Sequence, residues 1–195
     1  MSKDLLKIAG KEYNSRLLVG TGKYLNEDQA FKSIRASQSQ IVTVAIRRVE
    51  LDLNKRSDSI LNYITAEQFT ILPNTAGCFS AKEAVRIACL GRELLNGESL
   101  VKLEVLKDKE TLLPLMDETV LAAKELVDLG FQVMVYCTDE IDYAENLEDI
   151  GCVAIMPLAS PIGSGQGITN PDAILKIVDK ITCPVIIDAG IGTAS

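Results

Sequence analysis

The feature that most constrains the fold is a unit that recurs along the chain: a short apolar run rich in β-branched residues, followed by a segment with helical spacing. Seven such runs occur, at 16–22, 40–46, 69–74, 100–106, 131–137, 152–158 and 184–190. Their spacing leaves room for a strand, a helix and two turns in each unit. Because the runs are apolar on both faces, we expect parallel strands that are buried beneath helices.

The segments between the runs carry the signals of helix ends. Candidate N-terminal signals are Asn26 as an N-cap, Ser80 and Glu83 as a capping box, and Asn170 followed by Pro171. The segment 116–130 places acidic residues in its first turn and a glycine just past its end, as helices prefer. Residues 5–18 are expected to hold a small hairpin, which precedes the first strand of the repeated units.

Two α/β architectures fit this pattern, an open doubly wound sheet and a (β/α)₈ TIM barrel. Gly20 and Gly22 follow the first run, but Leu25 replaces the third glycine of a dinucleotide-binding fingerprint, and Leu17 replaces the first glycine of a P-loop. Repeated units with polar strand ends favour the barrel. Because a barrel needs eight strands and typically about 250 residues, the sequence predicts one barrel domain over 1–195, truncated after its seventh strand.

Composition narrows the function. The chain has 20 Lys and Arg against 27 Asp and Glu, a net charge of −7, which argues against nucleic-acid binding. No apolar run approaches the roughly 20 residues of a membrane helix and no targeting sequence is visible, so we expect a cytoplasmic protein, or a stromal one if it is encoded in a plastid. Histidine is absent, which excludes His-based catalytic pairs and metal sites. Carboxylates, lysines, tyrosines or cysteines must then carry acid-base chemistry.

The five cysteines lack the CxxC spacing of zinc or dithiol motifs, and no metal site is predicted. Their odd number within apolar stretches predicts reduced thiols, most of them small core residues. Cys137 is set apart because it lies where a predicted strand ends.

A lysine inside a strand is the most specific catalytic signal. In the run 100–106, side chains alternate between two faces, so Lys102 and Glu104 share one face and Val101, Leu103 and Val105 the other. The apolar trio suits the helix side, which directs Lys102 and Glu104 into the barrel. We expect burial to lower the pKa of Lys102, so that its neutral amine can form an imine with a ketone while Glu104 moves protons. The alternative is a buried ion pair that only fills the barrel.

Two further segments place polar groups at strand ends. Asp188 ends the run 184–190, where barrels hold catalytic residues, although it could also cap a following helix. The glycine-rich segment 160–171 leads into a helix, so its amides could hold an anion, or it could be a flexible connection. Arg47 and Arg48 follow the second run and could serve a phosphate, a partner or the solvated surface. The loop 74–77 has no role that its pattern reveals.

Seven motifs, in chain order, resemble those of thiazole synthase of thiamine biosynthesis. They are VGTGK (19–23), VTVAIRR (42–48), LPNTAG (72–77), VKLE (101–104), AIMPL (154–158), PIGS (161–164) and DAGIG (188–192). The resemblance covers essentially the whole chain. It implies a (β/α)₈ barrel enzyme that builds the thiazole phosphate from 1-deoxy-D-xylulose 5-phosphate, dehydroglycine (2-iminoacetate) and sulfur from the C-terminal thiocarboxylate of a carrier protein.

The resemblance also assigns residues and partners. The imine-forming lysine matches Lys102, the acid-base carboxylates match Glu104 and Asp188, and the sugar-phosphate contacts match Gly163, Ala189 and Gly190. It implies a homotetramer that also binds the sulfur carrier and the enzyme that supplies dehydroglycine. No metal or organic cofactor is implied.

The sequence departs from the family after residue 192. Family members continue through another helix and an eighth strand that completes the phosphate site, and a barrel without that strand leaves two sheet edges unpaired. Two alternatives therefore stay open beside the synthase. One is a Schiff-base aldolase of a phosphorylated ketose, and the other is a non-catalytic scaffold subunit.

Overall fold

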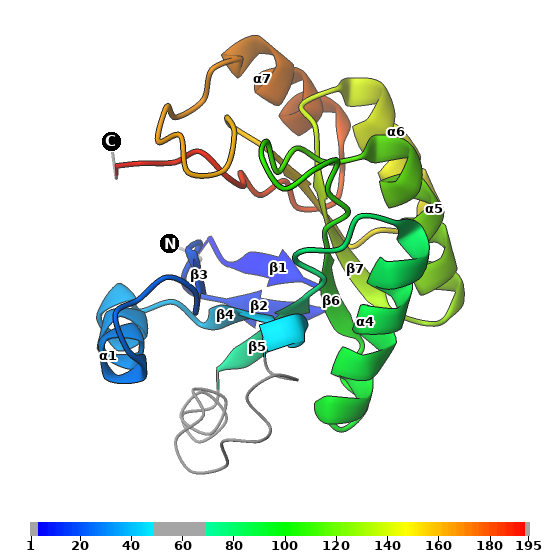
Figure 1. Ribbon diagram of the computed structural model, residues 1–195. Helices are drawn as coiled ribbons and strands as arrows, with labels where there is room; N and C mark the ends of the chain where they lie inside the picture. Colours follow the sequence, from blue (N-terminus) through cyan, green and yellow to red (C-terminus); the bar gives the residue numbers. More distant parts are fainter. Residues whose placement is uncertain (1–3, 49–68, 194–195) are drawn as a thin grey trace.

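The computed structural model describes residues 4–48 and 69–193 (Figure 1). Its main sheet has six parallel strands, which follow one another in the sheet as they do in the chain. The strands are β3 (Leu18–Gly20), β4 (Ile41–Ala45), β5 (Thr70–Asn74), β6 (Leu100–Leu103), β7 (Gln132–Cys137) and β8 (Ala154–Pro157). The helices are α1 (Glu27–Ser37), α4 (Ala81–Leu94), α5 (Met116–Asp128), α6 (Ile141–Ile150) and α7 (Pro171–Lys180). The sheet curls, and α4, α5 and α6 pack on its outer side, as in the predicted (β/α)₈ barrel.

The run 184–190 forms less of a strand than the sequence predicts. It lies parallel to β8 but pairs with it only through isolated bridges, Ile155 with Val185 and Leu158 with Asp188. The amide of Asp188 still donates to the carbonyl oxygen of Pro157 at 2.9 Å. Pro157 has no N–H to give in return, which interrupts the ladder between the two segments. The other six predicted strands are confirmed, with slightly narrower bounds.

Helices begin where the local signals predict. The side chain of Asn26 accepts a hydrogen bond from the amide of Gln29 at 2.9 Å, and Ser80 accepts one from the amide of Glu83 at 3.3 Å. Asn170 likewise caps α7, whose first residue is a proline. These caps satisfy amides that have no partner within the helix. Because the strands of the main sheet are parallel, the loops that lead from the strands into the helices lie at the same end of the barrel.

Apolar cores lie on both sides of the sheet. The outer core joins strands to helices and contains Val101, Leu103 and Val105 of the β6 region. The inner core contains Leu100 and residues from the predicted hairpin, which is confirmed as β1 (Leu6–Ile8) and β2 (Lys11–Tyr13). Figure 1 shows this hairpin in the hollow of the curled sheet. The hairpin therefore fills the interior of the barrel below the ends of the strands.

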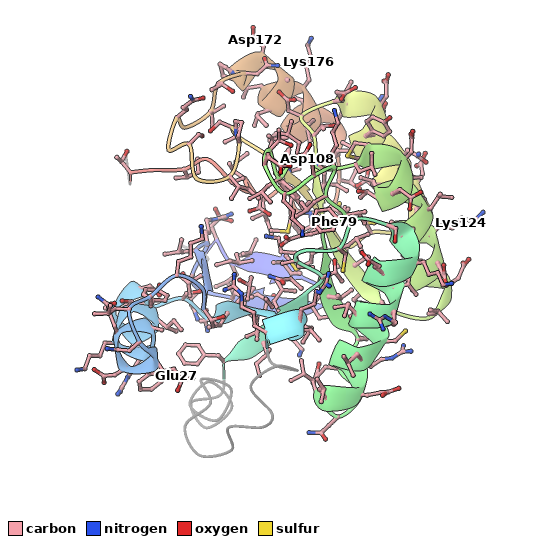
Figure 2. All side chains as sticks on the ribbon, in the orientation of Figure 1. Glu27, Phe79, Asp108, Lys124, Asp172 and Lys176 are labelled. Atoms are coloured by element: carbon pink, nitrogen blue, oxygen red, sulfur yellow. The ribbon has the colours of Figure 1, made fainter. Side chains whose placement is uncertain are left out.

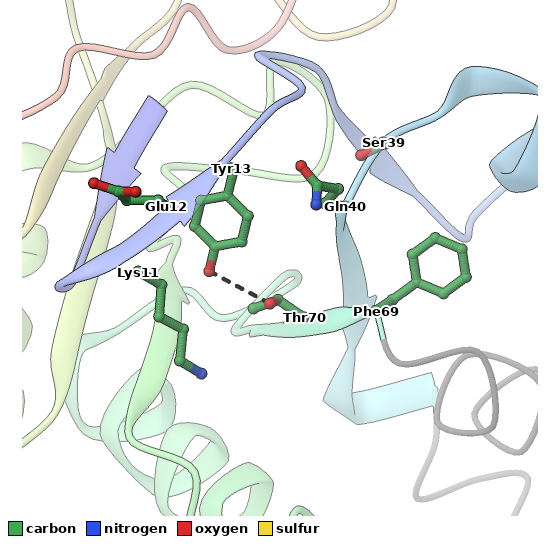
Figure 3. A pocket seen from close by; sticks show the side chains of 7 residues that line it. All are labelled: Lys11, Glu12, Tyr13, Ser39, Gln40, Phe69 and Thr70. Carbon is green, nitrogen blue, oxygen red and sulfur yellow. Dashed lines mark hydrogen bonds between the residues drawn. The ribbon is translucent and has the colours of Figure 1, made fainter. Parts of the chain in front are cut away.

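A cavity lined mainly by polar residues lies beside this hairpin. A cavity of about 580 Å³ is lined there by Lys11, Glu12, Tyr13, Ser39, Gln40, Phe69 and Thr70 (Figure 3). The Tyr13 hydroxyl donates to Thr70 Oγ1 at 3.4 Å, and Gln40 Oε1 accepts from the amides of Asn14 at 2.6 Å and Ser15 at 3.2 Å. Of the lining residues, Ser39, Gln40, Phe69 and Thr70 directly precede or begin β4 and β5, and the other three form β2. The cavity therefore lies at the amino end of the strands, opposite the end where barrels carry active sites.

We predict that α5 contributes stability through its inner face alone. Leu126 is 0% exposed and Leu121, on the same helix, is 59% exposed. Leu126→Ala should lower the free energy of unfolding by about 2–5 kcal/mol because it leaves a cavity in the outer core. Leu121→Ala, the matched control, should change it by less than about 0.5 kcal/mol. Urea unfolding measures both, and equal losses would contradict this packing.

Candidate active site

Three charged side chains meet inside the barrel at the carboxyl ends of the strands. Lys102 Nζ lies 3.3 Å from Glu104 Oε1 and 2.6 Å from Asp188 Oδ2. The side chains are 11%, 10% and 20% exposed, in the order Lys102, Glu104, Asp188. The structure therefore brings together the three residues that the sequence proposes as catalytic, from β6, its end, and the segment beside β8.

The alternation along β6 places the lysine. Val101 and Leu103 lie in the outer core and Leu100 in the inner one, so Lys102 and Glu104 share the inner face with Leu100. This is the orientation that the sequence predicts. Leu100 packs against the hairpin below, and the two charged residues follow it toward the open end. The fold therefore presents the amine above an apolar floor.

The expected pKa of Lys102 is wrong in direction. Burial is the largest single influence and lowers the pKa of the amine, but the charges and hydrogen bonds of Glu104 and Asp188 together raise it above its ordinary value. Burial also raises the pKa of Glu104, with a further contribution from the charge of Asp188, and Lys102 offsets only part of this. The resting site therefore holds an ammonium ion beside a carboxylate that accepts a proton more readily than usual.

Backbone contacts fix Asp188. Its amide bonds to Pro157, and its carbonyl oxygen accepts from the amide of Ala159 at 2.9 Å. Its carboxylate Oδ1 accepts from the amide of Ala189 at 2.8 Å, while Oδ2 faces Lys102. The Asp188 carboxylate therefore serves the lysine, and the amide that donates to it, among the described residues, is that of its own neighbour Ala189.

Two glycine-containing loops lie side by side next to Asp188. Gly190 has a φ of +71°, and a Cβ added there would lie 1.9 Å from Ser160 Oγ, so only glycine fits. The amide of Gly167 donates to the carbonyl oxygen of Gly190 at 2.9 Å, which ties the segment 160–167 to the segment 188–192. Gly163, Ala189 and Gly190, the predicted phosphate contacts, therefore come from adjoining loops. In this structure the Ala189 amide is engaged by Asp188.

Thr75, in a loop to which the sequence assigns no role, supports the site from behind. It is 0% exposed, and its Oγ1 lies 2.8 Å from both the amide nitrogen and the carbonyl oxygen of Glu104, accepting from the first and donating to the second. Its own amide donates to the carbonyl oxygen of Lys102 at 3.2 Å. At the end of β6, the Thr75 hydroxyl thus makes the hydrogen bonds that the backbone of a neighbouring strand would otherwise make. A threonine just past a strand is too common a feature to reveal this contact.

Tyr136 is a second residue that the sequence analysis misses. It is 1% exposed and follows the inner-core residue Met134 by two positions on β7, so it faces the interior. Burial raises its pKa, and the charges of Asp188 and Glu104 raise it further, so the phenol stays neutral. Its hydroxyl donates to the carbonyl oxygen of Leu112 at 3.4 Å. The alternation rule that placed Lys102 could have placed this tyrosine as well.

Three of the five cysteines are buried in the described part of the chain. Cys78, Cys137 and Cys152 are buried, and Cys137 packs in the outer core, away from the lysine. Burial raises the pKa of Cys78 to about 11 and that of Cys137 further, so neither is poised as a thiolate. Across 4–48 and 69–193, no three Cys, Asp or Glu residues are grouped to hold a metal ion, and no helix is long and apolar enough to cross a membrane.

Thr75 generates a test of how the site is built. Thr75→Val keeps the shape of the side chain but leaves the amide and carbonyl of Glu104 buried without partners, which should lower the free energy of unfolding by about 1–3 kcal/mol. Thr75→Ser keeps the hydroxyl and should cost less than about 1 kcal/mol. Urea unfolding compares the two. Valine as stable as serine would show that the hydroxyl does not support β6.

Comparisons with known sequences identify the family. The family model described as "Thiazole biosynthesis protein ThiG" matches residues 7–195. A curated thiazole synthase from Methylobacillus flagellatus is 57% identical over 192 residues, which cover 98% of this chain and 74% of the relative. Another, from Bordetella pertussis, is 56% identical over 194 residues, which cover 100% of this chain and 73% of the relative. The chain thus spans about three quarters of the length of these relatives.

Solved structures support the fold and the family. A chain in the crystal structure of the Amycolatopsis orientalis BexX/CysO complex is 31% identical, with a TM-score of 0.81 over 97% of this chain and 76% of that chain. The YdjI aldolase from Escherichia coli K12 is 14% identical, with a TM-score of 0.57 over 91% of this chain and 66% of that chain, and shares the fold alone. The family match along nearly the whole chain, together with the close curated relatives, shows that this chain belongs to the ThiG family of thiazole synthases.

Proposed function

We propose that this chain forms the thiazole phosphate of thiamine through an imine between Lys102 and 1-deoxy-D-xylulose 5-phosphate. The observation that carries the proposal is the Lys102 amine, which lies inside the barrel in contact with Glu104 and Asp188. Such a buried amine with two proton carriers beside it is what attack on a ketone requires. The aldolase and scaffold alternatives are not favoured by the relatives, which are named thiazole synthases.

The first step is a proton transfer within the charged group. The ammonium of Lys102 passes a proton to Glu104, whose pKa burial raises. A neutral pair is cheaper to keep away from water than an ion pair, so a substrate that displaces water would favour the transfer. The neutral amine then attacks C2 of the sugar, and the ketone oxygen leaves as water with the two hydrogens of the amine. The product is an imine on Lys102.

The imine then allows the carbon skeleton to rearrange. It withdraws electrons from C2, so the proton on C3 becomes acidic, and Glu104 or Asp188 can remove it and return one to the neighbouring carbon. The carbonyl group thereby moves by one carbon. Sulfur from the carrier thiocarboxylate attacks the new carbonyl carbon, the bond between sulfur and the carrier breaks, and the carrier leaves as a carboxylate with the oxygen of that carbonyl. The nitrogen of dehydroglycine then replaces Lys102 on C2, which frees the amine, and the sulfur closes the ring on the imine carbon of dehydroglycine while a second water is lost from the sugar. Both carboxylates contact the amine, which supports a proton role for each.

The phosphate of the sugar is proposed to bind the two adjoining loops. Gly163 and Gly190 have positive φ angles of 81° and 71° and line loops whose backbone is held by hydrogen bonds such as that between Gly167 and Gly190. Backbone amides in such loops suit an anion. The Ala189 amide, which donates to Asp188, would connect the phosphate to the catalytic carboxylate. The sugar would then reach from these loops to Lys102.

Protein partners complete the proposal. A sulfur carrier must bring its C-terminal thiocarboxylate to the open end of the barrel, and the likeness to a BexX chain crystallised with CysO supports a protein partner for this chain. The enzyme that supplies dehydroglycine and three further copies of the chain are the other proposed partners. We propose a cytoplasmic location.

The imine gives a direct chemical prediction. Incubation with 1-deoxy-D-xylulose 5-phosphate and borohydride should attach the reduced sugar to one residue, and peptide mapping by mass spectrometry should identify it as Lys102. Lys124→Met, which removes an exposed lysine on the outer face of α5 (Figure 2), should leave the yield unchanged. An intact mass that does not change, or an adduct on another lysine, would contradict the proposal.

The two carboxylates also predict a pH dependence. Because Asp188 and Glu104 hold the pKa of Lys102 up, Asp188→Asn should lower that pKa and make the amine neutral at lower pH. The rise of adduct formation with pH should then move by about 1–3 units toward acid, although the maximum rate falls with the loss of a proton carrier. Initial rates of trapping across a pH series measure this. Glu145→Gln, at an exposed ion pair with Lys180, is the control and should not move the midpoint.

A further inference from the structure

A second cavity opens beside the charged group and is not used by the steps above. It has a volume of about 790 Å³, and Glu104 forms part of its wall. Four cations, Lys23, Arg47, Arg48 and Lys109, line it together. We propose that this cationic chamber is a second anion subsite, which holds the carboxylate of a co-substrate beside the Lys102 imine. The inference rests on the proposed function, because it places a second reactant next to that lysine.

The chamber carries excess positive charge in an acidic protein. The chain has a net charge of −7, yet among the described residues that line the chamber four are cations and two are carboxylates. Glu83 is occupied as the cap of α4, where Oε2 accepts from the amide of Phe79 at 3.0 Å, and Glu104 contacts Lys102. Within residues 4–48 and 69–193, none of the four cations forms an ion pair with a carboxylate. An incoming anion would therefore meet positive charge that no carboxylate in the described part of the chain pairs with.

Three of the chamber cations lie against other parts of the chain. The Arg47 guanidinium donates to the carbonyl oxygen of Gly77. The Arg48 guanidinium passes close to Gly22, where a Cβ added to the glycine would lie 2.5 Å from Nη1. Lys109 lies 6.0 Å from the centre of the Phe79 ring. Three separate chain segments thus direct their charges to one cavity.

The lining also limits the ligand. Two guanidinium groups match the planar oxygens of a carboxylate. At the inner end the ligand meets Glu104, an acceptor, so the group that it presents there should carry an N–H. The best fit is a carboxylate joined closely to a nitrogen donor. A small two-carbon acid and the glycine-like end of a protein tail share this chemistry.

Binding to the intact protein tests the inference without any turnover. Oxamate carries a carboxylate and an N–H group but cannot form an imine, and oxamide has the same shape without the charge. By isothermal titration calorimetry, oxamate should bind the protein and oxamide should not. Arg48→Met should weaken oxamate binding by about tenfold or more through the loss of a charged hydrogen-bond partner. Lys124→Met removes one distant positive charge (Figure 2) and should leave oxamate binding unchanged.

Two further ligands settle the source and the class of the anion. Diglycine that binds at least about tenfold more tightly than oxamate would support a carboxylate at a protein tail, and the reverse order would support a small acid. Equal oxamate affinity in wild type and Arg48→Met, or displacement of oxamate only by inorganic phosphate, would overturn the inference. Failure of the imine proposal would be recognised separately, because borohydride trapping then fails while oxamate still binds.

Discussion

The site depends on one buried ammonium ion that faces two carboxylates. Removing a charge from water is expensive, and a buried ion is tolerated only when oppositely charged partners and hydrogen bonds compensate for the lost solvent. Lys102 has such partners in Glu104 and Asp188. With two carboxylates and one cation the group carries one excess negative charge, so it retains a carboxylate after Lys102 passes its proton to Glu104. That surplus is what lets the same group both stabilise the resting lysine and serve its chemistry.

Much of the surrounding fold holds these three side chains in register. Alternation along β6 gives Lys102 and Glu104 a common face, the hairpin fills the space beneath them, and the hydroxyl of Thr75 takes over the hydrogen bonds of Glu104 where the strand pairing ends. Asp188 arrives from the segment beside β8 and is fixed by backbone bonds on both sides. Glycine-rich loops lie on the Asp188 side of the lysine and the cationic chamber adjoins Glu104, so two anions could approach the amine by separate routes.

Local rules predicted most of the fold and the identity of the charged residues. Apolar runs and helix caps act within a few neighbouring residues, so the strands, the helix starts and the inward direction of Lys102 follow from the sequence. The direction of the pKa shift of Lys102 did not follow from the sequence. It depends on how closely the amine approaches the carboxylates of Glu104 and Asp188, whereas burial alone predicts a shift in the opposite direction. The sequence analysis missed Thr75 because its role depends on hydrogen bonds to Glu104, which is distant in the sequence. It missed the buried Tyr136 because the run that contains it looks uniformly apolar.

The most direct test of the account is a crystal structure of the protein after reduction with 1-deoxy-D-xylulose 5-phosphate. The account predicts continuous density from Lys102 Nζ to C2 of the sugar, with the phosphate against Gly163 and Gly190 and at least one of the two carboxylates within hydrogen-bond distance of the reduced nitrogen. A sugar bound elsewhere, with Lys102 still paired to both Glu104 and Asp188, would contradict it.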